Sequence, residues 1–165
     1  DFSAEHTRLS IERSLRSIKT DYLDIVLIHS NGRDCRILEH SDCPETLLRL
    51  QEEGLIRAVG MSTKTIEGGI RAAEMLDVVM VTYNPSMQDE AAVIDHAHTL
   101  EKGILVKKAL NSGHDCVAGQ VNAEAKSEGL TQKNLRFALG REGVTSVIVG
   151  TINPKHLKEN VEAVE

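Results

Sequence analysis

The chain has few of the residues that mark several common classes of protein. Only 2% of its 165 residues are aromatic and tryptophan is absent, so we expect a core filled by Leu, Ile, Val, Met and Ala. The three cysteines form no CxxC or Cys/His spacing, which argues against a disulfide framework or a metal site. A reducing, cytoplasmic setting is therefore the expected one.

Basic residues and long apolar runs are also scarce. With 19 Lys and Arg against 25 Asp and Glu, the formal net charge is −6, which argues against a nucleic-acid surface. Apolar runs such as 25–28 and 78–81 are far shorter than the roughly 20 residues that cross a bilayer. No charged-then-apolar leader opens the chain, so we expect a soluble, single-domain protein without nucleic-acid or membrane partners.

What the sequence does contain is a regular alternation of strand-like and helical segments. Five short apolar runs predict strands at 24–29, 57–61, 78–82, 104–107 and 146–149. The first of these shows no apolar/polar alternation, which is typical of a parallel strand buried on both faces. Segment 110–129 has no clear period and is predicted to be a long loop.

Amphipathic stretches between these runs predict helices, and several carry recognisable ends. The first covers about 7–19, with apolar residues at steps of three and four. Pro44 is suited to open a helix that Gly54 would close. Thr131 is a candidate cap for a helix ending at Gly140, and Asn153 with Pro154 predicts the start of the last helix.

Strands that alternate with helices imply parallel pairing by right-handed crossovers and ligands at the carboxyl ends of the strands. Two α/β architectures fit this order. A doubly wound five-stranded sheet would be complete at this length, whereas an eight-stranded barrel typically takes about 250 residues and would be incomplete. The alternation by itself leaves both open.

Two strand ends carry residues suited to catalysis. His29 ends the first predicted strand, where an imidazole can donate a hydrogen bond to a reacting carbonyl oxygen, or simply be an exposed loop histidine. Lys107 and Lys108 end the fourth predicted strand, where a desolvated amine could form a Schiff base. A structural ion pair, or a lysine that reaches solvent, explains the lysines equally well.

Other polar segments allow both a functional and a structural interpretation. Gly150–Pro154 joins the last strand to a helix start, which suits an anion but also an ordinary capped turn. The polar segment 34–42 could meet substrate as a loop. His96 and His98 are two apart on a helix and face different ways, which argues against a metal site. Cys116 is either a reactive thiol or an ordinary free cysteine.

Several motifs occur in one order along the chain. They are SLRSIKTDYLDIVLIH (14–29), EGLIRAVGMS (53–62), YNP (83–85), GILV (103–106) and VGTINPKHLKEN (149–160). This ordered set resembles the carboxyl-terminal part of an aldo-keto reductase. The resemblance implies an incomplete TIM (β/α)8 barrel, in which residues 1–165 form one partial domain with the fourth to eighth strands.

The resemblance also implies NAD(P)H-dependent reduction of an aldehyde or ketone by a tetrad of Asp, Tyr, Lys and His. Only the histidine has a match in this chain, at His29. The family's Asp, Tyr and Lys would lie upstream of Asp1, so we expect the chain to be inactive alone. The family favours NADP, with NAD possible, and a small carbonyl compound as substrate.

Cofactor-binding positions follow from the same motifs. Ser62 and Thr63 match the residues that bind the nicotinamide carboxamide, with Thr63 where an asparagine is usual. The positions that match the phosphate and adenine region are Gly150, Thr151, His156, Glu159 and Asn160. Open first and last strands could let the chain associate with itself. The alternatives are a non-catalytic cofactor-binding or regulatory protein on the same half barrel, and a Schiff-base lyase.

Overall fold

The computed structural model of the chain describes residues 1–110 and 123–164. Five strands form one parallel sheet in the order β1-β2-β3-β4-β5, with bounds Leu23–His29, Ile56–Ser62, Val78–Thr82, Gly103–Lys107 and Ser146–Val147. The helices are α1 (Ala4–Ile18), α2 (Asp34–His40), α3 (Cys43–Glu52), α4 (Ile66–Met75), α5 (Ala91–Thr99), α7 (Ala123–Leu139) and α8 (Pro154–Glu162). None of the described helices is long and apolar enough to cross a bilayer.

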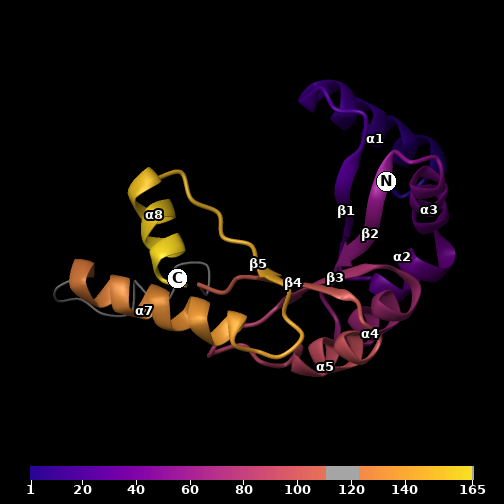
Figure 1. Cartoon of the computed structure of the whole chain (residues 1–165). Helices are drawn as coiled ribbons and strands as arrows, with labels where there is room; N and C mark the ends of the chain where they lie inside the picture. Colours follow the sequence, from indigo (N-terminus) through magenta and orange to yellow (C-terminus); the bar gives the residue numbers. More distant parts are fainter. Residues whose placement is uncertain (111–122, 165) are drawn as a thin grey trace.

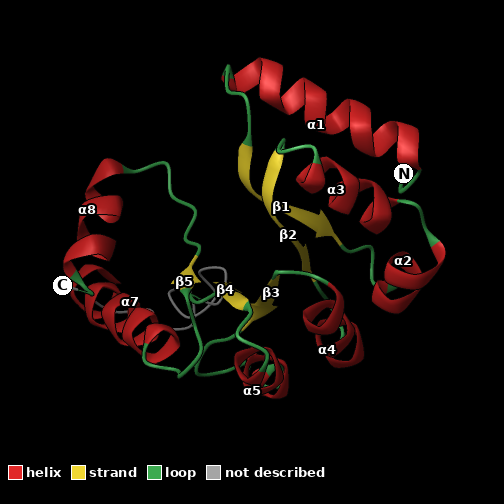
Figure 2. Ribbon diagram, turned by 45° about the vertical axis from the view of Figure 1, so that its right-hand side comes forward, coloured by secondary structure: helices red, strands yellow, loops and turns green. Residues whose placement is uncertain are grey.

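The strand order decides between the two architectures. All four strand pairs are parallel, and each strand pairs with the next one along the chain. Helices α1 to α5 lie along the outer side of the curved sheet, while α7 and α8 lie beside β5 (Figures 1 and 2). A doubly wound sheet would reverse its strand order at a switch point, so the arrangement is that of an open, partial barrel. This confirms the predicted α/β class with five parallel strands.

Several element boundaries agree with the sequence prediction because the signals there are local. Strand β3 has the predicted bounds, and Pro44 lies in the first turn of α3. Gly54, which follows α3, has the left-handed φ of +80° that favours glycine. The Asn153 side chain accepts a hydrogen bond from the backbone N of Lys155 at 3.0 Å, and so caps α8 as predicted.

The structure corrects three other predictions. Segment 34–42 was expected to be a loop, but Asp34–His40 forms α2 and buries Ile37 and Leu38. Helix α7 begins at Ala123, so Thr131 lies inside it and the predicted loop over 110–129 is wrong for 123–129. The rest of that prediction, at 111–122 with Cys116, lies outside the described residues. Strand β5 is two residues shorter than predicted.

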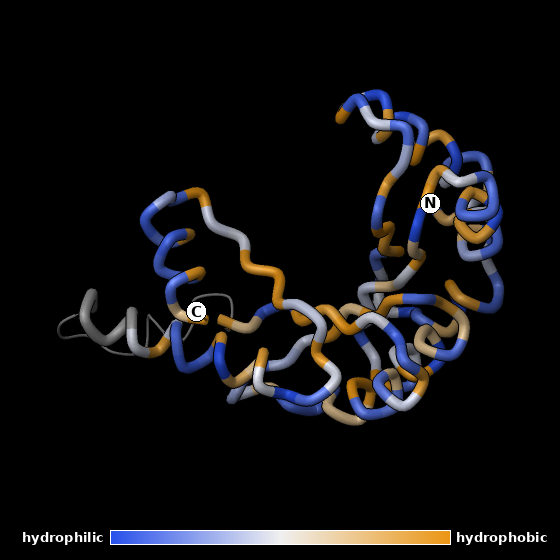
Figure 3. Tube along the Cα trace, in the orientation of Figure 1, coloured by the Kyte–Doolittle hydropathy of each residue, from blue (hydrophilic) through white to orange (hydrophobic). Residues whose placement is uncertain are grey.

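Strand β1 is also less buried than its composition predicts. Ile28 is buried against the core, but Ile25 is 47% exposed and His29 is exposed on the same side of the strand. Only the side facing the helices is covered, so the prediction of burial on both faces is wrong for β1. In Figure 3 the segment after β5 has apolar stretches separated by a paler, more polar part, and Ile148 and Ile152 in it are exposed.

The core lies between the sheet and its outer helices. Its fully buried members come from the central strands and the helices packed on them, and they include Val59, Val79, Val81, Ile104, Val106, Leu50 and Ile94. Aliphatic side chains fill this layer, as the scarcity of aromatic residues requires. The opposite, concave face is open (Figure 1). Because all strand pairs are parallel, the carboxyl ends of the strands lie along one edge of the sheet, which we call the rim.

Candidate active site

The carboxyl ends of β1 and β2 bring two predicted site residues next to each other. His29 and Ser62 are register partners at the last position of their strands. The parallel pairing continues beyond them, because Ser30 N donates to Ser62 O at 3.2 Å and Thr63 N donates to Met80 O at 3.2 Å. His29 is exposed, so its imidazole is open to a ligand at this edge.

Ser62 and Thr63 lie under the side chain of Lys107, which ends β4. The Lys107 ammonium donates to Ser62 Oγ at 3.0 Å and to the Thr63 carbonyl oxygen at 2.6 Å. Ser62 is 4% exposed and Thr63 is fully buried. Among the described residues, the buried Thr63 Oγ1 has no hydrogen-bond partner. Lys107 thus links the ends of β2 and β4 across β3.

Burial and neighbouring charges both act on the pKa of Lys107, with burial as the largest effect. Burial lowers the pKa of Lys107, the carboxylate of Glu90 raises it in part, and the positive charge of Lys108 lowers it further. Burial raises the pKa of Glu90, whereas hydrogen bonds from Thr82 and the charge of Lys107 lower it. Sequence reasoning missed Glu90 because an acidic residue just before a helix is an ordinary surface feature.

Asp34 does not meet substrate from a loop, as the sequence allowed. It is 2% exposed, and its carboxylate accepts from the Lys64 and Thr65 backbone N at 2.9 and 2.8 Å and from Thr65 Oγ1 at 2.7 Å. The Ser30 hydroxyl donates to its other oxygen. Burial acts to raise the pKa of Asp34, but these hydrogen bonds outweigh it and lower the pKa below the ordinary range.

This carboxylate joins the segments that follow β1 and β2. Ser30 comes directly after His29, and Lys64 comes directly after Thr63. Helix α4 packs so close to Asp34 that a Cβ at Gly68 would lie 2.0 Å from the Asp34 Cβ. Asp34 and Gly68 therefore hold the two segments that carry the candidate residues. No short motif in the sequence marks such a long-range contact.

The remaining predicted cofactor residues lie at the other end of the sheet. Gly150 and Thr151 follow β5, and the other three, on α8, are His156, Glu159 and Asn160. The Thr151 hydroxyl accepts from Asn153 N at 3.2 Å, which orders the turn into α8. Figures 1 and 2 show α8 and β1 on opposite arms of the curved sheet. The candidate site is therefore divided between two places on one rim.

Other residues considered from the sequence do not join this edge as ligands. Tyr83 is buried and stacks on Phe137 with ring centroids 5.2 Å apart, so its ring serves packing. Within residues 1–110 and 123–164, no group of three or more His, Cys, Asp or Glu could hold a metal ion. Cys35 and Cys43 are free thiols.

Comparison with known proteins identifies the family. The sequence profile of the aldo/keto reductase family matches residues 1–114, more than two thirds of the chain. The chain belongs to the aldo/keto reductase family. This confirms the resemblance inferred from the ordered motifs.

Solved structures and curated sequences give the extent of this similarity. A solved structure from Pseudomonas aeruginosa, described as an aldo-keto reductase, is 46% identical to this chain, with a TM-score of 0.86. The alignment covers all of this chain and 62% of that one. An oxidoreductase of Bacillus subtilis is 23% identical, with 99% of this chain and 61% of that protein aligned. The L-galactose dehydrogenase of Arabidopsis thaliana is 24% identical, with 99% and 59% aligned. The chain therefore spans about three fifths of the length of these relatives.

Proposed function

We propose that these residues provide the nicotinamide-binding part and the catalytic histidine of a carbonyl reductase that uses NADPH, with NADH possible. The observation that carries the proposal is the adjacent placement of His29 and Ser62 at the open carboxyl ends of paired strands. In a member of the aldo/keto reductase family, this is the edge at which a carbonyl group and a nicotinamide ring would meet.

The donor set at β2 suits a carboxamide. A serine hydroxyl has one donor and two acceptor positions, and Lys107 occupies one acceptor of Ser62, which leaves the O–H free to donate. The ammonium of Lys107 has three N–H groups and directs two of them to Ser62 and Thr63. Its third N–H and the Ser62 O–H are available to a carboxamide oxygen. The Thr63 Oγ1 atom has no partner among the described residues, but it is buried and is not counted among the groups that a ligand would contact.

The segment after β5 suits the phosphate end of the same cofactor. Gly150 offers no side chain, and a Cβ built there would have nothing within 4 Å, so an extended ligand has room at this turn. His156 and Asn160 lie one helical turn apart on α8 and share a face. Glu159 Oε1 forms an ion pair with Lys155 Nζ at 3.4 Å. We propose that these residues bind the phosphate and adenine groups.

In this mechanism the bound nicotinamide supplies the hydride. His29 donates a hydrogen bond to the substrate carbonyl oxygen, which polarises the carbonyl and orients its carbon. Ser62, to which Lys107 donates a hydrogen bond, would hold the carboxamide and so orient the nicotinamide. We infer that the proton donor and its Asp and Lys partners come from outside these residues, so the chain alone is a poor catalyst.

Aldehyde-dependent NADPH oxidation tests the proposal in a longer protein that contains these residues. We expect turnover that falls about a hundredfold in His29→Ala, the range for a positioned acid or hydrogen-bond donor. His6→Ala, at an exposed histidine on α1, is the matched control and should keep the wild-type rate. An unchanged rate in His29→Ala would remove His29 from the mechanism. NADPH binding without any turnover would instead favour the non-catalytic cofactor-binding protein.

A second candidate function rests on Lys107 alone. Burial lowers the pKa of Lys107, which is the condition for a lysine that attacks a carbonyl carbon. Against this, its two hydrogen bonds require the amine to act as a donor toward Ser62 and Thr63. Borohydride reduction in the presence of a simple aldehyde, followed by mass spectrometry, decides the point. An adduct on Lys107 would support a Schiff-base enzyme, and its absence would exclude one.

A further inference from the structure

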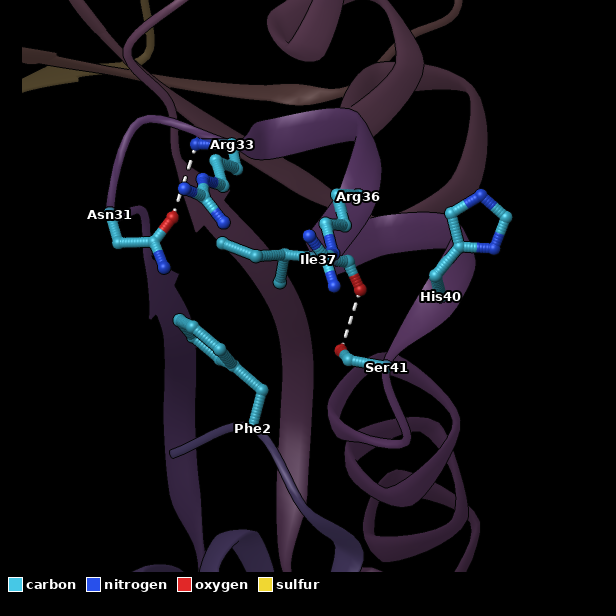
Figure 4. A pocket seen from close by; sticks show the side chains of 7 residues that line it. All are labelled: Phe2, Asn31, Arg33, Arg36, Ile37, His40 and Ser41. Carbon is cyan, nitrogen blue, oxygen red and sulfur yellow. Dashed lines mark hydrogen bonds between the residues drawn. The ribbon is translucent and has the colours of Figure 1, made fainter.

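A pocket of about 220 Å³ opens between Phe2, which precedes α1, and helix α2 with the loop before it (Figure 4). It is lined by Phe2, Asn31, Arg33, Arg36, Ile37, His40 and Ser41. Arg33 immediately precedes α2, and Arg36 lies on it. Figure 4 shows both arginine side chains turned towards Ile37, with the Phe2 ring facing them across the pocket. None of the residues that line it is acidic.

The two arginines differ from most others in the described chain. Arg8, Arg49, Arg57, Arg71 and Arg141, for example, each pair with a carboxylate. Within the described residues the guanidinium groups of Arg33 and Arg36 have neither an ion pair nor a hydrogen bond. Each is exposed and thus available to a ligand.

The two carboxylates nearest in sequence to Arg33 and Arg36 already accept hydrogen bonds from other residues. Asp34 is buried and takes hydrogen bonds from Ser30, Lys64 and Thr65. Glu39 accepts from Arg71 Nε at 3.0 Å, on a different side of α2. The lining thus carries two arginines and no acidic side chain, in a chain whose formal net charge is −6, although Asp1 and Asp42 are the sequence neighbours of Phe2 and Ser41. Such a contrast favours an anionic ligand at this place.

The neutral polar groups define what else the ligand would meet. Asn31 Oδ1 accepts from Arg33 N at 3.1 Å, which leaves the Asn31 amide N–H groups to donate. The Ser41 hydroxyl donates to Ile37 O at 2.6 Å, so it has no proton left to give. The His40 ring points away from the guanidinium groups in Figure 4, so it is not counted as a donor.

We propose that this pocket binds the phosphoryl group of a small phosphate monoester. Two planar guanidinium forks can share the three terminal oxygens of a phosphoryl group, with the Asn31 amide as a further donor. A single carboxylate has only two oxygens for the same donors. The volume is below the roughly 300 to 1,000 Å³ of pockets that enclose whole drug-sized ligands, which fits a head group with a short carbon chain against Phe2 and Ile37.

This site is separate from the proposed cofactor site. None of the residues that line it is among those proposed to bind the cofactor, which are Ser62 and Thr63 after β2 and the residues after β5 and on α8. The pocket is connected to the rim through the segment 30–33, which follows His29, and through Asp34 on α2, which accepts hydrogen bonds from Lys64 and Thr65. Phosphate binding in this pocket does not require NADPH. A chain that fails to bind phosphate can therefore still be tested for NADPH binding, and the reverse is also true.

The test is a titration of the 165-residue chain with inorganic phosphate and with glycerol 3-phosphate, followed by backbone amide chemical shifts. Sodium chloride at matched ionic strength gives the baseline, and succinate is the carboxylate comparison. We expect saturable shifts within residues 31–41 for both phosphates. Arg33→Met and Arg36→Met should each weaken binding about tenfold, the value of a charge-assisted hydrogen bond.

Two variants separate the ligand contact from a change in folding. Arg13→Met removes an exposed arginine of α1 that also lacks an ion pair among the described residues, and it should leave phosphate binding unchanged. Arg36→Lys keeps the charge but loses the fork, so it should bind more weakly than wild type. Three results would overturn the proposal. They are shifts that do not saturate, Arg33→Met and Arg36→Met variants that bind phosphate as tightly as wild type, and succinate that binds as tightly as phosphate.

Discussion

Two polar side chains, Asp34 and Lys107, hold the segments around the candidate site. Asp34 accepts hydrogen bonds from the segments that follow β1 and β2. Lys107, at the end of β4, donates hydrogen bonds to Ser62 and Thr63. Both are buried or half-buried, and both have pKa values moved from the ordinary range, downwards in each case. Substitutions at Asp34 and at Lys107 separate their effects.

Replacing Asp34 tests its role between the strand ends. Asp34→Ala leaves four donors without their acceptor, so we expect a loss of about 3 kcal/mol in the free energy of unfolding, with a smaller loss in Asp34→Asn. The measurement is urea unfolding near pH 7. Asp89→Ala, at an exposed carboxylate, is the control and should lose little. Equal stability of Asp34→Ala and wild type would contradict this role.

The lowered pKa of Asp34 also predicts a pH dependence. The unfolded carboxyl binds a proton at a higher pH than the folded one, so the stabilisation is complete above the ordinary Asp pKa and is lost as the pH falls through the folded pKa. Wild type should therefore lose more stability than Asp34→Asn between neutral pH and acid. Parallel pH profiles of the two proteins would exclude the hydrogen-bonded carboxylate as the cause.

Lys107→Met tests the charge coupling to Glu90. The cation lowers the pKa of Glu90, and burial raises it, so removing the cation should move the pKa of Glu90 further upwards. The measurement is the titration of the Glu90 carboxyl carbon by NMR. Lys108→Met, at the exposed neighbour, should have a much smaller effect. A lower or unchanged pKa of Glu90 in Lys107→Met would contradict the coupling.

At the scale of whole elements, the sequence predicted what short-range signals control. Strand β3 and the starts of α3 and α8 depend on β-branched runs, a first-turn proline and a side-chain cap, which lie within a few residues. Helix α2 was missed because it has seven residues and no side-chain cap. The start of α7 was missed because Gly129 and polar residues resemble a loop, although Ala123–Lys126 are good helix formers.

In the candidate site, too, some residues could be predicted from the sequence and others could not. His29 was predicted because it ends an apolar run, and Ser62 because it matches a motif of the family; the parallel pairing of their strands makes them neighbours. The contacts of Asp34 with Thr65 and of Lys107 with Ser62 join residues more than 30 and more than 40 positions apart. No periodicity in one sequence encodes such distances, so these contacts needed the structure.

The packing of β2 against β3 gives a prediction at this scale. A Cβ at Gly60 would lie 2.2 Å from the Val78 carbonyl oxygen and 2.7 Å from a Leu27 methyl group. Gly60→Ala must separate the strands locally, so we expect a loss of about 3 kcal/mol in unfolding free energy. Gly129→Ala, with nothing within 4 Å on a helix, should lose none. Thermal unfolding of both variants checks this, and an equally stable Gly60→Ala would contradict the close approach.

For the molecule as a whole, the open sheet is the dominant feature. The concave side of β1 and the segment after β5 expose apolar residues that a closed barrel would cover, among them Ile25 and Ile152. Strand β1 also has an edge that no described strand pairs with. We expect the isolated chain to associate with itself through these edges, as unpaired strands commonly do.

Sedimentation velocity over a range of concentrations measures this association. Ile25→Lys places a charge on the exposed face of β1 and should shift the chain towards monomer. Ile18→Lys, at an exposed isoleucine of α1 away from the sheet, should leave the distribution unchanged. A chain that stays monomeric at high concentration would contradict association through the open edges.

Our central proposal for the molecule is that one extended cofactor binds along this rim, from the end of β2 to the segment after β5. A titration of the chain with NADPH, followed by backbone amide shifts, tests that claim most directly. We predict saturable shifts with one common dissociation constant at Ser62 and Thr63 and at Gly150 and Thr151, weakened in Ser62→Ala. Shifts that never saturate, or that are confined to residues 31–41, would contradict it.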